Sequence, residues 1–61
     1  MSTYRILILM DNDAFQDGNE GAEVARILRK LADHAEADGS AEYVRLFDAN
    51  GNHVGDASSA Y

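Results

Sequence analysis

The stretch "EYVRLFDANGNHVGDA", residues 42–57, decides the fold of this chain. Its first half alternates in polarity and so divides between the two faces of a strand, with Val44 and Leu46 on one face and Tyr43, Arg45 and Phe47 on the other. Asn50 and Gly51 then predict a tight hairpin turn of type I′, which needs two residues that tolerate positive φ. The returning strand, around residues 52–57, is weak because only Val54 is strongly apolar. We expect it to lie at an edge of the sheet or to fray.

The chain before the hairpin predicts a strand and then a helix. "YRILILM", residues 4–10, is rich in β-branched and aromatic residues and holds no Gly or Pro, which is typical of a strand. Alternate residues divide between its two faces, with Tyr4, Ile6, Ile8 and Met10 on one and Arg5, Leu7, Leu9 and Asp11 on the other. "GAEVARILRKLADHAEADG", residues 21–39, predicts an amphipathic helix, because its apolar residues recur at spacings of three and four: Val24, Ile27, Leu28, Leu31, Ala32 and Ala35.

Polar residues and a glycine mark the two ends of the predicted helix. Asp17 and Glu20 are three residues apart and fit a capping box, and Asn19 is the alternative N-cap. Gly39 follows the last polar residue of the helix and is expected at the C′ position, where a glycine ends many helices.

The order strand, helix, strand, strand predicts an α+β fold, β-α-β-β, with one amphipathic helix packed on a small three-stranded sheet. We expect a single small domain over residues 1–61, with residues 56–61 as a loose tail. If the helix covers Ile6, Ile8, Val44 and Leu46, an apolar set looks outward: Leu7, Leu9, Tyr43 and Phe47. We expect a second copy or a partner to bury this face. The alternative is that the tail or a bent third strand folds over it.

The composition excludes several kinds of protein. The chain has 61 residues and no cysteine, so disulfides and thiolate metal sites are excluded. Eleven acids against five bases give a net charge of −6, which disfavours direct binding to nucleic acid. The apolar run at residues 6–10 is too short to span a membrane. We therefore expect a soluble, cytoplasmic protein whose marginal stability favours help from a second subunit.

Acidic residues are the candidate partner-binding site: Asp11, Asp13, Asp17, Glu20, Glu23, Asp33, Glu36 and Asp38. The stretch at residues 10–23 does not match the ligand spacing of an EF-hand calcium loop. His34 and His53 have neither a nucleophile motif nor a phosphate-binding glycine loop near them, so we expect no catalytic residue, no metal site and no cofactor. The pattern is typical of a solvated face, or of a DNA mimic that occupies a basic groove built for phosphates. Acids near the helix C-terminus oppose the helix dipole and favour the second interpretation.

Three segments, "YRILILMDNDAF", "GAEVARILRKLAD" and "LFDANGNHVG", resemble a family of very small proteins carried by bacteriophages and other mobile elements. Their size, acidity and element order are also similar to those of small anti-CRISPR proteins that block type I surveillance complexes. The resemblance implies an inhibitor in the cytoplasm of a bacterial host, bound to a CRISPR effector with a basic nucleic-acid-binding groove. The alternative is a homodimeric structural or interaction module that uses the apolar face of the sheet.

Overall fold

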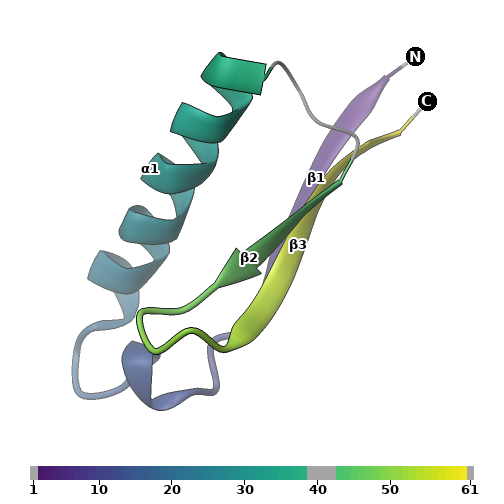
Figure 1. Ribbon diagram of the computed structural model, residues 1–61. Coiled ribbons are helices and arrows are strands. Elements are labelled where there is room, and N and C mark those ends of the chain that lie inside the picture. The colour runs from purple at the N-terminus through teal and green to yellow at the C-terminus, as the bar shows by residue number, and fades with distance from the viewer. Residues whose placement is uncertain (1, 39–42, 61) are drawn as a thin grey trace.

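The computed structural model describes residues 2–38 and 43–60 and confirms the α+β fold, with the order strand, helix, strand, strand (Figure 1). The elements are β1 (Thr3–Ile8), the 3-10 helix η1 (Asp13–Phe15), α1 (Glu20–Asp38), β2 (Tyr43–Phe47) and β3 (His53–Ala60). α1 lies on one face of a three-stranded antiparallel sheet. Gly39, expected to end the helix, and Tyr61, the last residue of the expected tail, lie outside the described residues.

β3 is the central strand, because the sheet runs in the order β1-β3-β2. The expectation of a weak edge strand around residues 52–57 is therefore wrong, and residues 56–60 belong to β3 and not to a loose tail. A Cβ atom at Gly55 would lie 1.8 Å from the carbonyl oxygen of Leu7, so the backbones of β1 and β3 leave no room for a side chain there. The strand was underestimated because it is built from small residues, which carry little apolar periodicity.

The hairpin between β2 and β3 forms where it was predicted, but its turn is not of type I′. Gly51 has a φ of 85°, whereas Asn50 does not have a positive φ. The Gly51 N–H donates to the carbonyl of Asp48 at 3.0 Å, and the Asp48 N–H donates to the carbonyl of Asn52 at 2.9 Å. The loop is therefore one residue longer than a type I′ hairpin, with the glycine alone in the left-handed region.

The type I′ pattern of positive φ occurs instead just before α1. Asp17 has a φ of 57° and Gly18 a φ of 82°, and the Asn19 N–H donates to the carbonyl of Gln16 at 3.1 Å across this turn. The capping box expected between Asp17 and Glu20 is wrong, since Asp17 is used to reverse the chain. α1 begins at Glu20, so Asn19 takes the N-cap position.

The hydrophobic core is small and lies between α1, η1 and the β2–β3 hairpin. Its buried side chains are Phe15, Ile27, Leu31, Leu46, Val54 and Ala57. The predicted helical stripe is only partly buried, because Leu28 is 40% exposed. α1 packs chiefly against η1 and β2, so the helix covers one side of the sheet more than the other.

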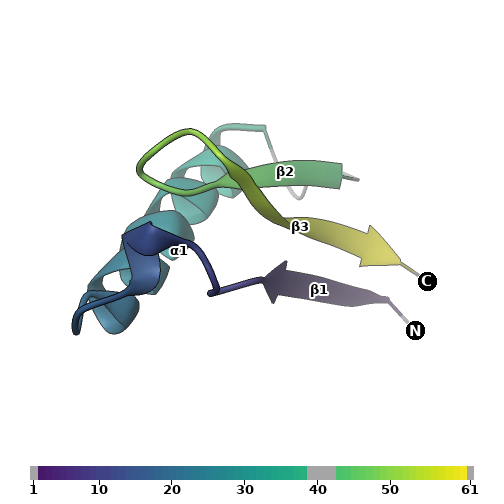
Figure 2. The same cartoon turned by 90° about the horizontal axis from the view of Figure 1, so that it is seen from below.

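β1 is the strand that the helix leaves open. Ile6 was expected beneath the helix but is 45% exposed, and Ile8 is only partly buried. The reason is the strand order: with β3 in the centre, β1 lies on the opposite edge of the sheet from β2, where α1 packs (Figure 2). β1 therefore exposes apolar side chains on both of its faces.

Candidate interaction surfaces

One group of acids surrounds the start of α1. Asp11, Asp13, Asp17 and Glu20 are all exposed, in the segment that runs from the end of β1 through η1 to the helix. Within residues 2–38 and 43–60, none of their carboxylates forms an ion pair. This group has the exposure that a partner-binding surface needs.

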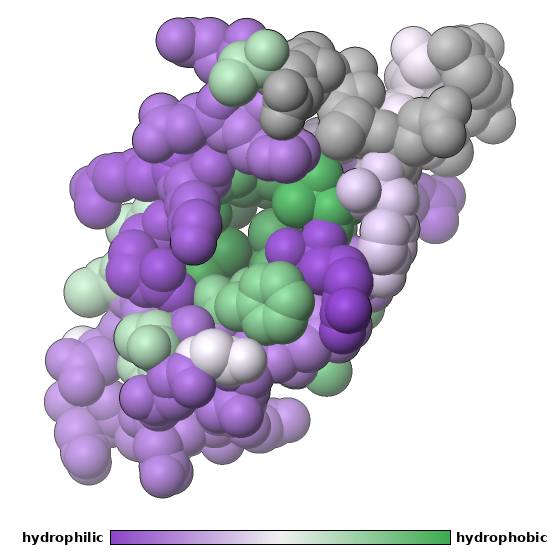
Figure 3. Space-filling model, viewed as in Figure 1, coloured by the Kyte–Doolittle hydropathy of each residue, from purple (hydrophilic) through white to green (hydrophobic). Residues whose placement is uncertain are grey.

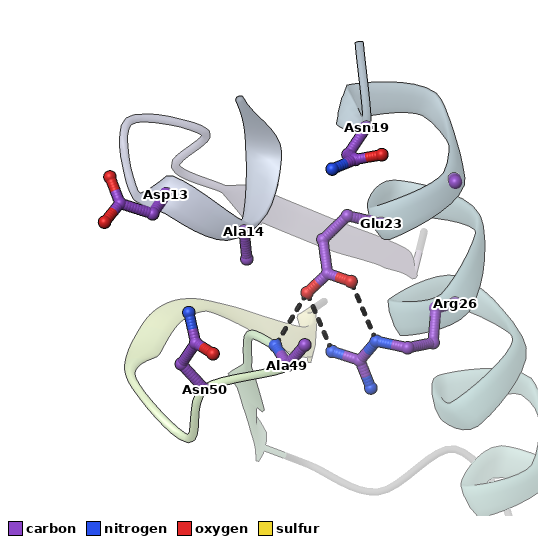
Figure 4. A pocket seen from close by; sticks show the side chains of 8 residues that line it. Asp13, Ala14, Asn19, Glu23, Arg26, Ala49 and Asn50 are labelled. Atoms are coloured by element: carbon purple, nitrogen blue, oxygen red, sulfur yellow. Dashed lines mark hydrogen bonds and ion pairs between the residues drawn. The ribbon is translucent and has the colours of Figure 1, made fainter. Parts of the chain in front are cut away.

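Glu23, predicted as a partner-binding residue, is instead buried and paired. Its carboxylate accepts hydrogen bonds from Arg26 Nε at 2.9 Å, from Arg26 Nη2 at 3.0 Å and from the Ala49 N–H at 2.8 Å (Figure 4). The bonds from Arg26 lower the pKa of Glu23; burial opposes this, and the Ala49 N–H adds to the lowering. The same guanidinium donates to the carbonyl of Phe47 at 3.0 Å. Glu23 therefore joins α1 to the hairpin and has no free oxygen to offer a partner.

Asp48 is a second structural carboxylate, which the sequence analysis missed. It is buried and accepts hydrogen bonds from the N–H groups of Asn50 at 2.9 Å and Asn52 at 2.8 Å. The side-chain amides of Asn12 and Asn52 also donate to it, each at 3.1 Å. Burial raises the pKa of Asp48, but the hydrogen bonds from Asn52, Asn12 and Asn50 outweigh burial and hold it below its ordinary value. The available signal was the Asp-x-Asn spacing, typical of a side chain that closes its own turn.

The remaining acids lie further along α1. Asp33 and Glu36 are exposed, and Asp38 is the last residue of the helix. At about 1.5 Å per residue, Asp33 lies roughly 20 Å along the axis from Glu20. Arg26, Arg29 and Lys30 occupy the stretch between them. The exposed acids therefore form two separate groups with basic residues between them.

The outward face of the sheet carries the predicted apolar set. The exposed fractions are 58% for Leu7, 56% for Leu9, 57% for Tyr43 and 44% for Phe47, so their predicted exposure is confirmed. We call these four residues the outer patch. They lie on the two edge strands, β1 and β2, and on the chain just after β1.

Polar residues of β3 run through the middle of the outer patch. The Tyr43 hydroxyl donates to Asp56 Oδ1 at 2.5 Å, and His53 Nε2 lies 3.1 Å from the same oxygen. The hydrogen bond from Tyr43 is the largest effect that lowers the pKa of Asp56, and the bond from His53 is the next. Sequence reasoning missed Asp56 and His53 because β3 was not expected between the other two strands.

The guanidinium of Arg45 extends the outer patch with an aromatic contact. Its central carbon lies 5.5 Å from the centre of the Phe47 ring, and the His53 ring lies 5.7 Å from Phe47 on a tilted plane. A cation over an aromatic face is an attractive arrangement. The β2 half of the outer patch is therefore aromatic and basic, while the β1 half is aliphatic.

Described residues line two hollows beside the helix. Figure 3 shows hydrophobic residues gathered in a hollow between α1 and β2, which is about 100 Å³ and is lined by Ile27, Leu31, Val44 and Leu46. This is below the range of roughly 300–1,000 Å³ that is usual for small-molecule pockets. The larger hollow, about 510 Å³, opens between η1, α1 and the hairpin, and the hydrogen-bonded Glu23–Arg26 pair forms part of its lining (Figure 4). The larger hollow is also lined by the exposed Asp13, and the smaller one by Lys30 and His34.

Comparison with known proteins finds no relative of this chain. No known protein family, curated protein or solved structure matches the chain. The described residues contain no group of three or more His, Asp or Glu side chains placed to hold a metal ion. Among the described helices, none combines the length and apolar character needed to cross a membrane.

Proposed function

We propose that this protein is a non-catalytic protein-interaction module that binds through the outer patch. The observation that carries this proposal is the exposure of Leu7, Leu9, Tyr43 and Phe47 together on one face of a three-stranded sheet. Large apolar side chains that are exposed on one face of a small protein mark an interaction site, and here they form two groups, one on each side of the polar residues of β3. Burying one such side chain contributes roughly 1.5–3 kcal/mol, so the patch can supply a substantial part of a binding free energy.

The residue types of the outer patch support the same proposal. Tyr, Phe and Arg are enriched in protein–protein interfaces, and Tyr and Arg in the residues that dominate their energy. Tyr43 and Arg45 both belong to this face. Asp56 lies in the middle and offers a polar handle that can fix the orientation of a partner.

The test compares capture by two variants with the same chemical change at different places. Tagged wild type, Leu9→Asp and Leu28→Asp are incubated with bacterial lysate at low and high salt, and the bound proteins are identified by mass spectrometry. Leu28 is the matched control because it is also an exposed leucine but lies on α1. We expect capture that resists salt, survives in Leu28→Asp and is lost in Leu9→Asp. Equal capture by both variants, or capture by none of the three proteins, would refute the proposal.

A second candidate function rests on the exposed acids around the start of α1. Asp11, Asp13, Asp17 and Glu20 lie near the N-terminal end of the helix and have no ion-pair partner in the described part of the chain. They could enter a basic groove, as the inhibitor of a type I CRISPR surveillance complex would. We place this candidate second because Glu23 is already saturated by Arg26 and Ala49.

Charge reversal separates this candidate from the first. The triple variant Asp11→Lys, Asp13→Lys, Asp17→Lys should lose inhibition of the surveillance complex, while the corresponding triple Asn variant should lose part of it. Inhibition should also weaken as salt is raised, because exposed charges are screened. Full inhibition by the Lys variant would eliminate the acid-based mechanism.

A further inference from the structure

On the side away from β3, β1 presents a backbone edge with which no other described strand pairs. The Leu9 N–H donates to the carbonyl of Val54 at 2.7 Å, so the backbone groups of the odd-numbered residues face β3. Backbone groups alternate along a strand, and those of Tyr4, Ile6 and Ile8 therefore point away from β3. In Figure 2 no described element lies beyond this side of β1. Such an edge is a ready template for another strand.

The chain exposes more surface than a compact protein of its mass. The chain exposes 4460 Å², whereas a compact protein of 6.6 kDa exposes about 3,900 Å². Its radius of gyration is 12.0 Å, against about 10.5 Å for a compact domain of this length. The excess is about 600 Å², and a second copy in a standard interface would cover roughly 800 Å² of this surface.

We propose that a second copy of this chain pairs with β1 through its own β1, in an antiparallel register centred on Ile6. Ile6 then faces Ile6 of the second copy, and Tyr4 faces Ile8 of the second copy. These are the residues whose backbone groups are free, so each pair exchanges both of its N–H···O=C bonds. The two sheets join into one, with β1 next to β1 at the centre.

The charge on β1 favours the register centred on Ile6 over the adjacent register, which is centred on Arg5. Arg5 is the single charged residue of β1, and the surplus of acids lies in other parts of the chain. A register centred on Arg5 would place two guanidinium groups directly opposite each other, and like charges in that position destabilise a sheet. In the register centred on Ile6, Arg5 faces Leu7 of the second copy instead.

The inference deepens the proposed function and rests on it, because pairing brings the outer patches of both copies onto one continuous face. Leu7 of each copy lies next to the junction, whereas Tyr43 and Phe47 lie on the far strand of each sheet. The dimer therefore presents a wider binding face than one copy does.

Cysteine crosslinking tests the register directly. The chain has no cysteine, so each single-cysteine variant gives an unambiguous result. In Ile6→Cys the two Cα atoms would be about 5.5 Å apart, within the range that a disulfide bridges. In the matched control, Tyr4→Cys, they would be about 14 Å apart, at about 3.4 Å per residue along the strands. We expect mild oxidation to crosslink Ile6→Cys and not Tyr4→Cys; equal crosslinking of both, or of neither, would overturn the register.

Charge-swapped variants keep the test independent of disulfide geometry. Light scattering should give wild type a mass about twice 6.6 kDa. Ile6→Lys and Ile6→Glu should each be monomers with an unchanged circular dichroism spectrum, and an equimolar mixture should regain the doubled mass. A monomeric wild type at its highest soluble concentration would overturn the inference.

The two proposals fail in different ways. If wild type is monomeric but Leu9→Asp still abolishes capture, the dimer is wrong and the interaction module stands. If wild type is a dimer but Leu9→Asp captures the same proteins, the edge pairing stands and the outer patch is not the binding site.

Discussion

Glu23 connects the helix to the hairpin through hydrogen bonds to its carboxylate. Its carboxylate accepts bonds from Arg26 on α1 and from the Ala49 N–H in the hairpin, and Arg26 reaches on to the Phe47 carbonyl. Burial alone disfavours a charged carboxylate, and Glu23 stays ionised there because both of its oxygens accept hydrogen bonds. The contact between Glu23 and Ala49 spans 26 residues, which is why no local pattern predicts it.

Replacing Glu23 by Gln should destabilise the fold markedly. Gln keeps the shape of the side chain but cannot accept charge-assisted bonds from both Arg26 nitrogens, and we expect a loss of about 2 kcal/mol in the free energy of unfolding. Urea unfolding followed by circular dichroism measures this loss. Glu20→Gln is the matched control, since Glu20 is exposed in the first turn of the same helix. Equal losses of unfolding free energy in the two variants would mean that the hydrogen bonds of Glu23 do not stabilise the fold more than an exposed carboxylate does.

Acid should weaken the protein through Glu23 and Asp48 together. Both carboxyls have a pKa below its ordinary value in the folded chain, so each contributes stability at neutral pH that is lost as the pH falls through the folded pKa. We expect the free energy of unfolding to decline from about pH 4.5 downwards. The decline should be shallower in Asp48→Asn, which has no carboxyl to protonate there. Identical pH slopes for this variant and wild type would show that Asp48 is not part of the acid response.

At the scale of elements, the sequence predicts which segments form strands and the helix better than it predicts which strands pair with one another in the sheet. The alternation of residues 43–47 and the helical spacing of Ile27 and Leu31 reflect burial of their own side chains, and both elements form. The place of β3 depends instead on the fit of Gly55 against the β1 backbone, a contact that side-chain periodicity cannot reveal. The same limit explains the candidate site: the exposed outer patch was predicted, but its polar centre at Asp56 was not.

Adding a single methyl group at Gly55 should prevent the sheet from forming. The Cβ of Gly55→Ala would lie 1.8 Å from the Leu7 carbonyl oxygen, and the neighbouring atoms are backbone that cannot move aside. We expect this variant to be unfolded by circular dichroism. Gly21→Ala is the control: nothing lies within 4 Å of its Cβ position on α1, and removing a helical glycine should stabilise the fold by about 0.5–1 kcal/mol. A cooperative melt of Gly55→Ala near that of wild type would contradict the close approach of β1 and β3.

For the whole molecule, a small core and a wide apolar surface have one cause. The helix packs on the β2 side of a sheet whose central strand is made of small residues, so β1 receives little cover. A chain of this size has a small free energy of unfolding. Each apolar side chain that stays exposed on β1 adds no hydrophobic stabilisation to the single copy. A second copy paired along β1 recovers part of that burial and leaves the outer patch available to a partner.

The melting temperature should therefore depend on protein concentration. Pairing stabilises only the folded chain, and mass action shifts the melt of a dimer by about 5 °C for each tenfold rise in concentration, given about 2.1 cal/mol/K per residue. Ile6→Lys should melt at a temperature that does not change with concentration, because two ammonium groups would face each other at the centre of the pairing. Glu36→Gln is the control, since it shifts the net charge by the same amount on an exposed part of α1 and should behave like wild type. A wild-type melt that stays constant over two tenfold dilutions would mean that the open edge of β1 is not closed by a second copy.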